Sequence, residues 1–209
     1  MDIKLFNQEG KEKWTIELNE ILFWQKEIKE GLIHRALIYQ LANARKVVAH
    51  TRTRWERRWS TRKIYRQKWT GNARMGSNRS PIRKKWGVVF GPRNNVNYSI
   101  SMNRKERRKA LFYVLSSKLQ DNKLVIVDDI KFDNIATKNM EAVMKKLSYE
   151  KNVLLVIPSK NEIIEKSSSN LPFVKTILTS YLNIADLLKF NTLVILKDSL
   201  NKMEESYVK

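Results

Sequence analysis

The feature that most constrains this chain is a central span without hydrophobic periodicity. Residues 46–97 show neither the helical nor the strand spacing of apolar residues, and Arg, Trp, Ser, Asn and Gly dominate them. An irregular span of this length is uncommon inside a compact domain unless it is functional or disordered. We therefore expect an extended loop that becomes ordered only when it binds a partner.

The positive charge is concentrated in and just after this span. Residues 45–109 contain 21 Lys and Arg and two acids, Glu56 and Glu106, whereas the other residues contain 20 basic and 19 acidic side chains. The whole chain has a formal charge of +20. Because so large a charge attracts polyanions, nucleic acid is the first candidate partner and an anionic membrane surface the second.

Several classes of protein are disfavoured by composition. The chain has no Cys, so disulfides and thiolate metal sites are excluded. Its first residues lack the apolar core of a secretory signal, and no apolar run approaches the roughly 20 residues of a membrane helix. We expect a soluble protein that works in the compartment where it is made, with no membrane partner.

The flanking sequence predicts alternating strands and helices. Residues 3–18 indicate two short strands around a turn, and Asn19 is placed to cap a helix that continues to about Ala44. Capping-box spacings precede two further helices, Asn103 with Glu106 and Ser159 with Glu162. The remaining expected elements are strands in 123–129, 152–158, 173–178 and 192–196, and helices that begin near Thr137, Asn183 and Asp198.

Continuously apolar strands that alternate with helices are typical of a parallel sheet covered on both faces. The predicted fold class is α/β, with a mostly parallel sheet, flanking helices in Rossmann-like layers and a long basic loop inserted. We expect residues 1–45 and 98–209 to form the globular domain and residues 46–97 to form the loop.

The composition of the loop favours RNA. Lys and Arg neutralise phosphates, Gly permits close backbone approach, and aromatic rings stack on unpaired bases. A solvated tail or a localisation signal would explain the charge. It would not explain why four of the six Trp lie in a segment without a core. The aromatic candidates are Trp55, Trp59, Tyr65, Trp69 and Trp86.

The sequence supports a catalytic function less well than RNA binding. The Gly71–Gly76 spacing resembles a phosphate-binding loop but lacks the following Lys and the preceding strand. Asp128 and Asp129 end an expected strand, where a backbone-bonded turn is the simpler explanation. His34 and His50 have no neighbour at metal-ligand spacing. No catalytic residue, metal or cofactor is predicted.

Short motifs across the loop occur in a family-specific order. They are Arg66-Gln67-Lys68, Thr70-Gly71, Ala73-Arg74, Gly76-Ser77, Ser80-Pro81 and Gly87–Pro92, with Arg52-Thr53-Arg54 upstream and Asn103-Arg104-Lys105 and Ala110-Leu111 downstream. Together they resemble the bacterial-type large-subunit ribosomal protein uL4 family, which is also found in organelles.

The resemblance implies a structural, non-enzymatic protein of the large ribosomal subunit. Its loop would thread into 23S-type rRNA, and the tip would line the narrow part of the nascent-peptide exit tunnel. The implied partners are that rRNA, ribosomal protein uL22, other large-subunit proteins and the nascent peptide. The implied location is the cytoplasmic ribosome of a bacterium, or the ribosome of a plastid or another organelle.

The candidate site residues follow by position in the loop. The expected RNA-binding residues are Arg45, Arg52, Thr53, Arg54, Lys63, Arg66, Gln67, Lys68, Thr70, Gly71, Arg74, Gly76, Ser77, Arg79, Ser80, Arg83, Lys84, Gly87, Gly91 and Arg93. The expected tunnel tip comprises Ile64, Tyr65, Arg66, Gln67, Lys68 and Trp69.

This chain departs from the family where bulky residues replace glycines, for example at Trp69. We hypothesise that Trp69 or Tyr65 stacks on an rRNA base. Two other functions stay open at this point. One is an RNA-binding regulator that acts on messenger RNA outside the ribosome, and the other is an α/β nucleic-acid enzyme that uses Asp128 and Asp129.

Overall fold

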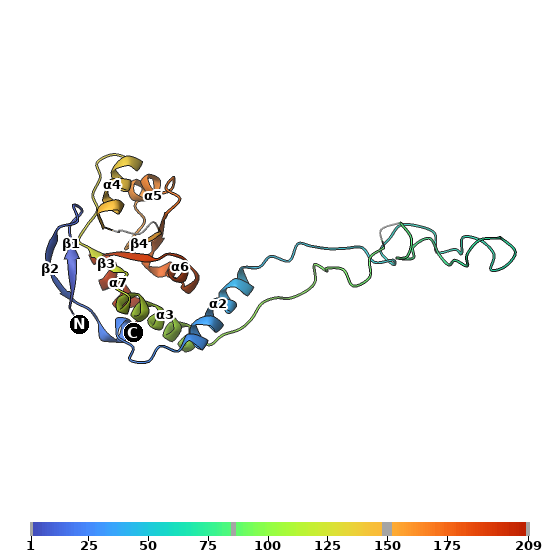
Figure 1. Cartoon of the computed structure of the whole chain (residues 1–209), viewed down its shortest axis with the longest axis horizontal. Coiled ribbons are helices and arrows are strands. Elements are labelled where there is room, and N and C mark those ends of the chain that lie inside the picture. The colour runs from blue at the N-terminus through green and yellow to red at the C-terminus, as the bar shows by residue number, and fades with distance from the viewer. Residues whose placement is uncertain (1, 85–86, 148–151, 208–209) are drawn as a thin grey trace. The chain divides into compact units, whose positions relative to one another are not determined.

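The computed structural model describes residues 2–84, 87–147 and 152–207. The chain divides into two compact units (Figure 1). We call Met1–Ala42 with Ile100–Lys209 the α/β unit, and Asn43–Ser99 the basic unit.

A six-stranded sheet organises the α/β unit. Its strands, in spatial order, are β2 (Glu12–Glu17), β1 (Asp2–Phe6), β3 (Leu124–Val127), β6 (Thr192–Leu196), β4 (Val153–Ile157) and β5 (Val174–Leu178). Only the β1–β2 pair is antiparallel, and the other four pairings are parallel. The prediction of a mixed α/β fold with a mostly parallel sheet is confirmed.

The central strands are buried on both faces. Every residue of β4 and β6 is buried, which explains why their sequences are continuously apolar. Along β4, Leu154 and Val156 join one hydrophobic cluster, whereas Val153, Leu155 and Ile157 join another. Successive side chains thus enter opposite layers, as the two-residue period of a strand requires.

Helices form these two layers (Figure 1). The first cluster includes apolar residues of α3 (Arg104–Gln120), α6 (Ile184–Lys189) and α7 (Lys197–Tyr207). The second includes residues of α4 (Thr137–Leu147) and α5 (Glu162–Ser168). A short 3₁₀ helix, η1 (Thr179–Tyr181), follows β5. No helix in residues 2–84, 87–147 or 152–207 is long and apolar enough to span a membrane.

The predicted helix from Asn19 to Ala44 is wrong as a single element. Asn19 does cap a helix, because its side-chain oxygen accepts a hydrogen bond from the Ile21 amide at 3.0 Å. That helix is α1 (Glu20–Phe23), however, and α2 (Glu30–Ala44) starts separately. The amide of Gln25 leaves the helical path and donates to Ser116 Oγ of α3 at 3.1 Å.

Two predicted capping boxes are also wrong. The Asn103 side chain makes no capping hydrogen bond at α3, and Glu106 instead lies 3.6 Å from Arg35. Helix α5 is capped by Asn161, whose side-chain oxygen accepts from two amides of the first turn at 3.1 and 3.4 Å, rather than by Ser159. Thr137 is the first residue of α4.

Candidate nucleic-acid interface

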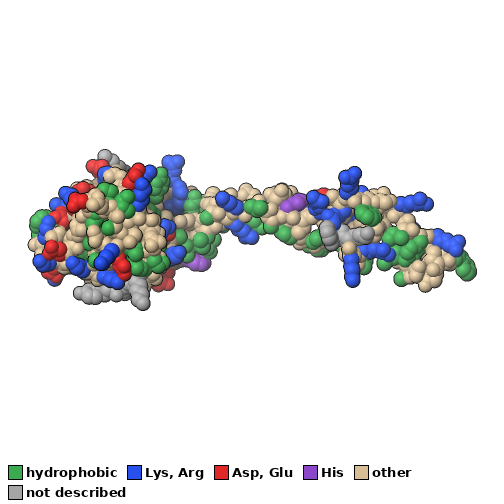
Figure 2. Space-filling model, turned by 90° about the horizontal axis from the view of Figure 1, so that it is seen from above, with side chains coloured by type: hydrophobic (Ala, Val, Ile, Leu, Met, Phe, Trp, Pro, Cys, Tyr) green, Lys and Arg blue, Asp and Glu red, His purple; other side chains and the backbone are tan. Residues whose placement is uncertain are grey.

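The basic unit has no core of its own. None of its described residues is buried, and the unit contains 16 Lys and Arg against one acid, Glu56. Figure 2 shows acidic side chains gathered on the α/β unit and basic ones throughout the basic unit. Large apolar side chains are exposed in this unit, including Val48, Trp55, Trp69, Ile82 and Phe90. Burial of its own apolar surface therefore cannot stabilise this unit.

One side-chain contact and several backbone hydrogen bonds join the two limbs of this unit into a long hairpin. At the base, the Arg45 guanidinium lies 3.8 Å from the centre of the Tyr98 ring. Further along, the Thr51 amide donates to the Pro92 carbonyl at 2.9 Å, and the Val88 amide donates to the Arg52 carbonyl at 3.0 Å.

Near the tip the limbs stay in register. Lys63 and Ser77 form an isolated antiparallel bridge, and the Ile64 amide donates to the Gly76 carbonyl at 3.3 Å. The Tyr65 hydroxyl donates to the Ala73 carbonyl. The chain therefore turns back between residues 66 and 72.

The turn contains two residues in the left-handed region. Trp69 has a φ of 67° and Gly71 a φ of 66°. Glycine accepts such a φ at no steric cost, whereas tryptophan does not. The Arg66 guanidinium donates to the Trp69 carbonyl at 3.0 Å and so closes the turn. The Trp69 ring is 86% exposed, so the fold presents it to solvent at the end of the hairpin.

Two of the four candidate glycines are required by close neighbours, Gly91 by the opposite limb and Gly87 by an earlier residue of its own limb. A Cβ at Gly91 would lie 2.1 Å from Thr51 Oγ1, and one at Gly87 would lie 2.9 Å from the Arg79 carbonyl oxygen. Gly76 has open space around it and no positive φ. The close approach seen here is thus within the hairpin, between limbs at Gly91 and within one limb at Gly87, and approach of these glycines to RNA stays a prediction.

The candidate cations fall into two groups. Side chains on the surface include those of Arg45, Arg52, Arg54, Lys63, Arg66, Lys68, Arg74 and Lys84. Arg79, Arg83 and Arg93 are half-buried and bond within the unit. Arg79 donates to the Trp59 carbonyl, and Arg83 Nε lies 3.4 Å from Met75 Sδ.

Arg93 is engaged most strongly within the unit. Its guanidinium donates to Glu56 Oε1 at 2.6 Å and to the Thr51 carbonyl at 3.3 Å. The hydrogen bond from Arg93, helped by one from the Thr53 amide, lowers the pKa of Glu56 below its usual value. The only acid of the basic unit is therefore already neutralised by Arg93.

The polar candidates mostly support the limbs. Ser77 Oγ donates to the Ser60 carbonyl at 3.1 Å, and Gln67 accepts from the Lys63 ammonium. The Ser80 amide donates to the Ser77 carbonyl at 3.2 Å, and Thr70 lies half-buried in the turn. Trp86 lies outside the described residues.

Phe90 and Ile82 are aromatic and apolar candidates that the sequence reasoning missed. The Phe90 side chain is fully exposed and its φ is 56°, while Ile82 is 90% exposed. A usable signal was present, because the apolar run Val88-Val89-Phe90 lies in a segment without any core to receive it.

The residues of the enzyme alternative are occupied by structural contacts. Asp128 Oδ2 lies 2.5 Å from the Lys13 ammonium, and this hydrogen bond lowers the pKa of Asp128. Asp129 accepts from the Ile130 amide at 2.8 Å. His34 is exposed on α2, and His50 lies 3.7 Å from Glu56. Among the residues described, no group of three acids or histidines could hold a metal.

Comparison with known proteins identifies the family. The model of the ribosomal protein L4/L1 family matches residues 16–206. The chain is 44% identical over 206 residues to large ribosomal subunit protein uL4 of Agathobacter rectalis and to that of Lachnospira eligens, covering 99% of this chain and 98% of each relative. It is 40% identical over 205 residues to uL4 of Dehalococcoides mccartyi, covering 98% of this chain and 97% of the relative. The chain therefore belongs to the ribosomal protein L4/L1 family.

Proposed function

We propose that this protein is a structural constituent of the large ribosomal subunit and binds rRNA through its basic unit. Family membership gives the ribosomal role, and this role is not enzymatic. The observation that carries the RNA-binding role is a well-defined hairpin without a single buried residue among those described. Such a unit needs a polyanion to neutralise it and a surface to cover its apolar side chains.

The exposed cations would contact phosphates, each contact releasing condensed counterions. We assign this role first to Arg52, Arg54, Arg66, Lys68 and Arg74, which lie on the surface of the hairpin. Since Arg79 and Arg93 bond to the opposite limb, they would hold the limbs together, whereas Arg83 contacts Met75 on its own limb. All three would offer RNA only their remaining donors.

We place the tunnel tip at residues 64–69, where the hairpin approaches its turn. The exposed ring of Trp69 would stack on an rRNA base, while the Tyr65 hydroxyl keeps its bond to Ala73. Ribosomal protein uL22 and the nascent peptide are the partners proposed for this end, and 23S-type rRNA is the partner along both limbs.

We assign residues 1–45 and 98–209 to the globular domain, for which the two helix layers support Rossmann-like layering. Residues 46–97 form the inserted rRNA-binding loop. The relatives in the comparison are bacterial proteins, which supports the cytoplasmic ribosome of a bacterium as the location.

Ultraviolet crosslinking in cells, with sequencing of the attached RNA, tests this proposal. We expect crosslinks concentrated on large-subunit rRNA, with the protein retained in large subunits at high salt. Crosslinks spread over messenger RNA, with loss of the protein from subunits at high salt, would favour the regulatory alternative instead.

A matched pair of tryptophan variants tests the tip. Trp69→Ala removes a stacked ring and should weaken rRNA binding by about 1–3 kcal/mol. Trp14→Ala removes a ring that is 52% exposed on β2 of the α/β unit, and it should leave binding unchanged. Equal affinities of the two variants would argue against stacking by Trp69.

Limited trypsin digestion tests whether the basic unit becomes ordered on RNA. In the free protein we expect cleavage throughout residues 46–97 while the α/β unit resists, because the basic unit buries no side chain among those described. In purified large subunits the same sites should be protected. Protection of these sites in the free protein would contradict ordering on binding.

A further inference from the structure

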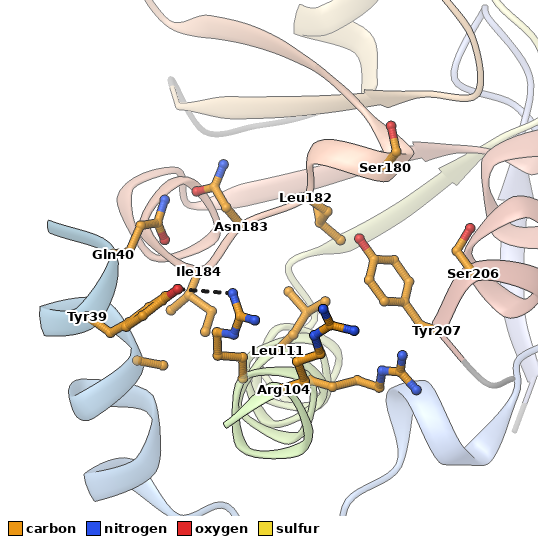
Figure 3. A pocket seen from close by; sticks show the side chains of 13 residues that line it. Tyr39, Gln40, Arg104, Leu111, Ser180, Leu182, Asn183, Ile184, Ser206 and Tyr207 are labelled. Atoms are coloured by element: carbon orange, nitrogen blue, oxygen red, sulfur yellow. Dashed lines mark hydrogen bonds between the residues drawn. The ribbon is translucent and has the colours of Figure 1, made fainter. Parts of the chain in front are cut away.

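A concave site lies in the α/β unit (Figure 3). Its volume is about 520 Å³, which falls in the range of small-ligand sites. Residues of α2, α3, η1, the start of α6 and the end of α7 line it, together with the two residues between η1 and α6. We call it the α2–α3 pocket.

The floor of the α2–α3 pocket is apolar. Ala36, Leu111, Leu182 and Ile184 line it, and each is less than 10% exposed. Tyr39 from α2 and Tyr207 from α7 stand on opposite sides of this floor (Figure 3). A flat, weakly polar ring system fits between such walls, since base–aromatic contact is favourable for every base.

One rim of the pocket is strongly cationic. Arg104, Arg107 and Arg108 line it, and no acid is present among its lining residues. The acid nearest in sequence, Glu106, is directed to Arg35 at 3.6 Å. Guanidinium groups gathered in a wall that contains no carboxylate favour a phosphate, because arginine binds phosphate oxygens through paired N–H donors.

Arg107 is held in position by Tyr39. Its Nη1 donates to the Tyr39 hydroxyl at 3.1 Å, and its guanidinium lies 5.2 Å from the centre of the Tyr39 ring. Its Nε has no hydrogen-bond partner among the described residues. An unmade bond at a guanidinium is costly, so an acceptor oxygen brought by a ligand would be stabilising here.

A polar edge completes the site. The Gln40 side-chain oxygen accepts from the Ala185 amide at 3.1 Å, which orients the Gln40 amide group. Asn183 is engaged as the cap of α6, because its oxygen accepts from the Asp186 amide at 2.9 Å and its NH2 group donates to the Tyr181 carbonyl at 3.2 Å and to Asp186 Oδ2 at 2.8 Å. The Gln40 amide group, held in one orientation, can donate to the hydrogen-bonding edge of a base.

We propose that the α2–α3 pocket binds one nucleotide of RNA that is turned out of its helix. The base would contact Tyr39 and the apolar floor, and its phosphate would lie against Arg104 and Arg107. This inference rests on the rRNA-binding role proposed above. It adds a contact in the α/β unit that is separate from the basic unit.

Paired arginine and lysine variants test the phosphate contact. Arg104→Gln and Lys105→Gln remove the same charge from adjacent exposed residues, but only Arg104 lines the pocket. The full-length variants are titrated with rRNA extracted from large subunits that contain the protein, over a range of salt. Arg104→Gln should weaken binding about tenfold and reduce the slope of log K against log[salt] by about 0.7. Lys105→Gln should change affinity by less than about twofold, and equal effects would overturn the proposal.

Nucleotide adducts locate the base. After ultraviolet irradiation of purified large subunits, mass spectrometry should find a nucleotide adduct on Tyr39 or on the 104–111 peptide. Tyr39→Ala should weaken binding of the extracted rRNA at least fivefold. Tyr181→Ala, at an exposed tyrosine that does not line this pocket, should leave it unchanged.

The outcomes separate this proposal from the broader one. Adducts on the basic unit without any at the pocket would overturn the pocket alone, whereas absence of rRNA adducts from the whole protein would overturn the rRNA-binding role proposed above. Saturable binding of free AMP that is lost in Arg104→Gln, without a Tyr39 adduct to rRNA, would assign the pocket to a free nucleotide and overturn RNA as the source.

Discussion

Gly91→Ala probes whether the register of the two limbs matters for RNA binding. A Cβ at Gly91 would lie 2.1 Å from Thr51 Oγ1, 2.8 Å from Val88 Cγ1 and 3.0 Å from Thr51 Cβ. Ordinary contact begins at about 3.4 Å, so the opposite limb must move.

The expected loss of free energy follows from the hydrogen bonds that join Thr51 to Pro92. Thr51 donates to the Pro92 carbonyl twice, from its amide at 2.9 Å and from its hydroxyl at 3.1 Å. Rotation of the Thr51 side chain would relieve only the hydroxyl clash and would lose one bond. Because Thr51 Cβ stays too close, a backbone shift would lose the second. At about 0.5–1.5 kcal/mol per bond the cost is about 1–3 kcal/mol.

The assay is equilibrium binding of the full-length protein to large-subunit rRNA at one salt concentration. If the limbs close in register only in the complex, the cost appears in binding, as about a 5- to 150-fold weaker association. Gly31→Ala in α2 is the control, since a Cβ at Gly31 would have nothing within 4 Å and the φ of Gly31 is not positive. Equal affinities for Gly91→Ala and Gly31→Ala would refute this reasoning.

The α/β unit provides three further predictions. Leu155→Ala at the fully buried centre of β4 should lower the free energy of unfolding by about 2–5 kcal/mol in urea denaturation. Asn161→Ala should cost about 1 kcal/mol in the same assay because it removes the cap of α5, whereas Ser159→Ala should cost almost nothing. The hydrogen bond from Lys13 lowers the pKa of Asp128 below 3.8, so the charged carboxylate stabilises the folded state above that pH. Asp128→Asn should therefore be less stable than the native protein at pH 7, and the difference should shrink as the pH falls through the lowered pKa.

The sheet could be predicted from the sequence because its central strands have one environment along their length. β4 and β6 are buried at every position, so each is an uninterrupted apolar run in the sequence. Such a run is typical of a strand in a parallel sheet covered on both faces. The antiparallel β1–β2 pair could be predicted equally well, because apolar and polar residues alternate on both sides of a turn.

Helix ends were less predictable because a cap depends on where the chain is held by other elements. The break after α1 depends on Ser116, which is distant in sequence and supplies the acceptor for the Gln25 amide. At α5, both Ser159 and Asn161 are good capping residues, and only the path of the chain out of β4 decides between them.

In the candidate site too, features that depend on local composition could be predicted, whereas features that depend on contacts between distant residues could not. The charge and the absence of a core could be read directly from residues 46–97, since both are properties of composition. The register could not, because it depends on pairs such as Thr51 with Pro92. The engagement of Arg93 by Glu56 was likewise invisible, so a cation that looked available in sequence is largely used within the hairpin.

In this hairpin, the residues that determine the shape are therefore different from the residues that make a binding partner necessary. Gly91 permits the limbs to approach, and a few backbone bonds align them. These bonds contribute on the order of 1 kcal/mol each, which cannot offset an entropy cost of about 1–2 kcal/mol for every ordered residue. Repulsion among the cations adds to this deficit. The missing free energy has to come from RNA, so a change that disturbs the limbs should weaken rRNA binding while the unfolding of the α/β unit stays the same.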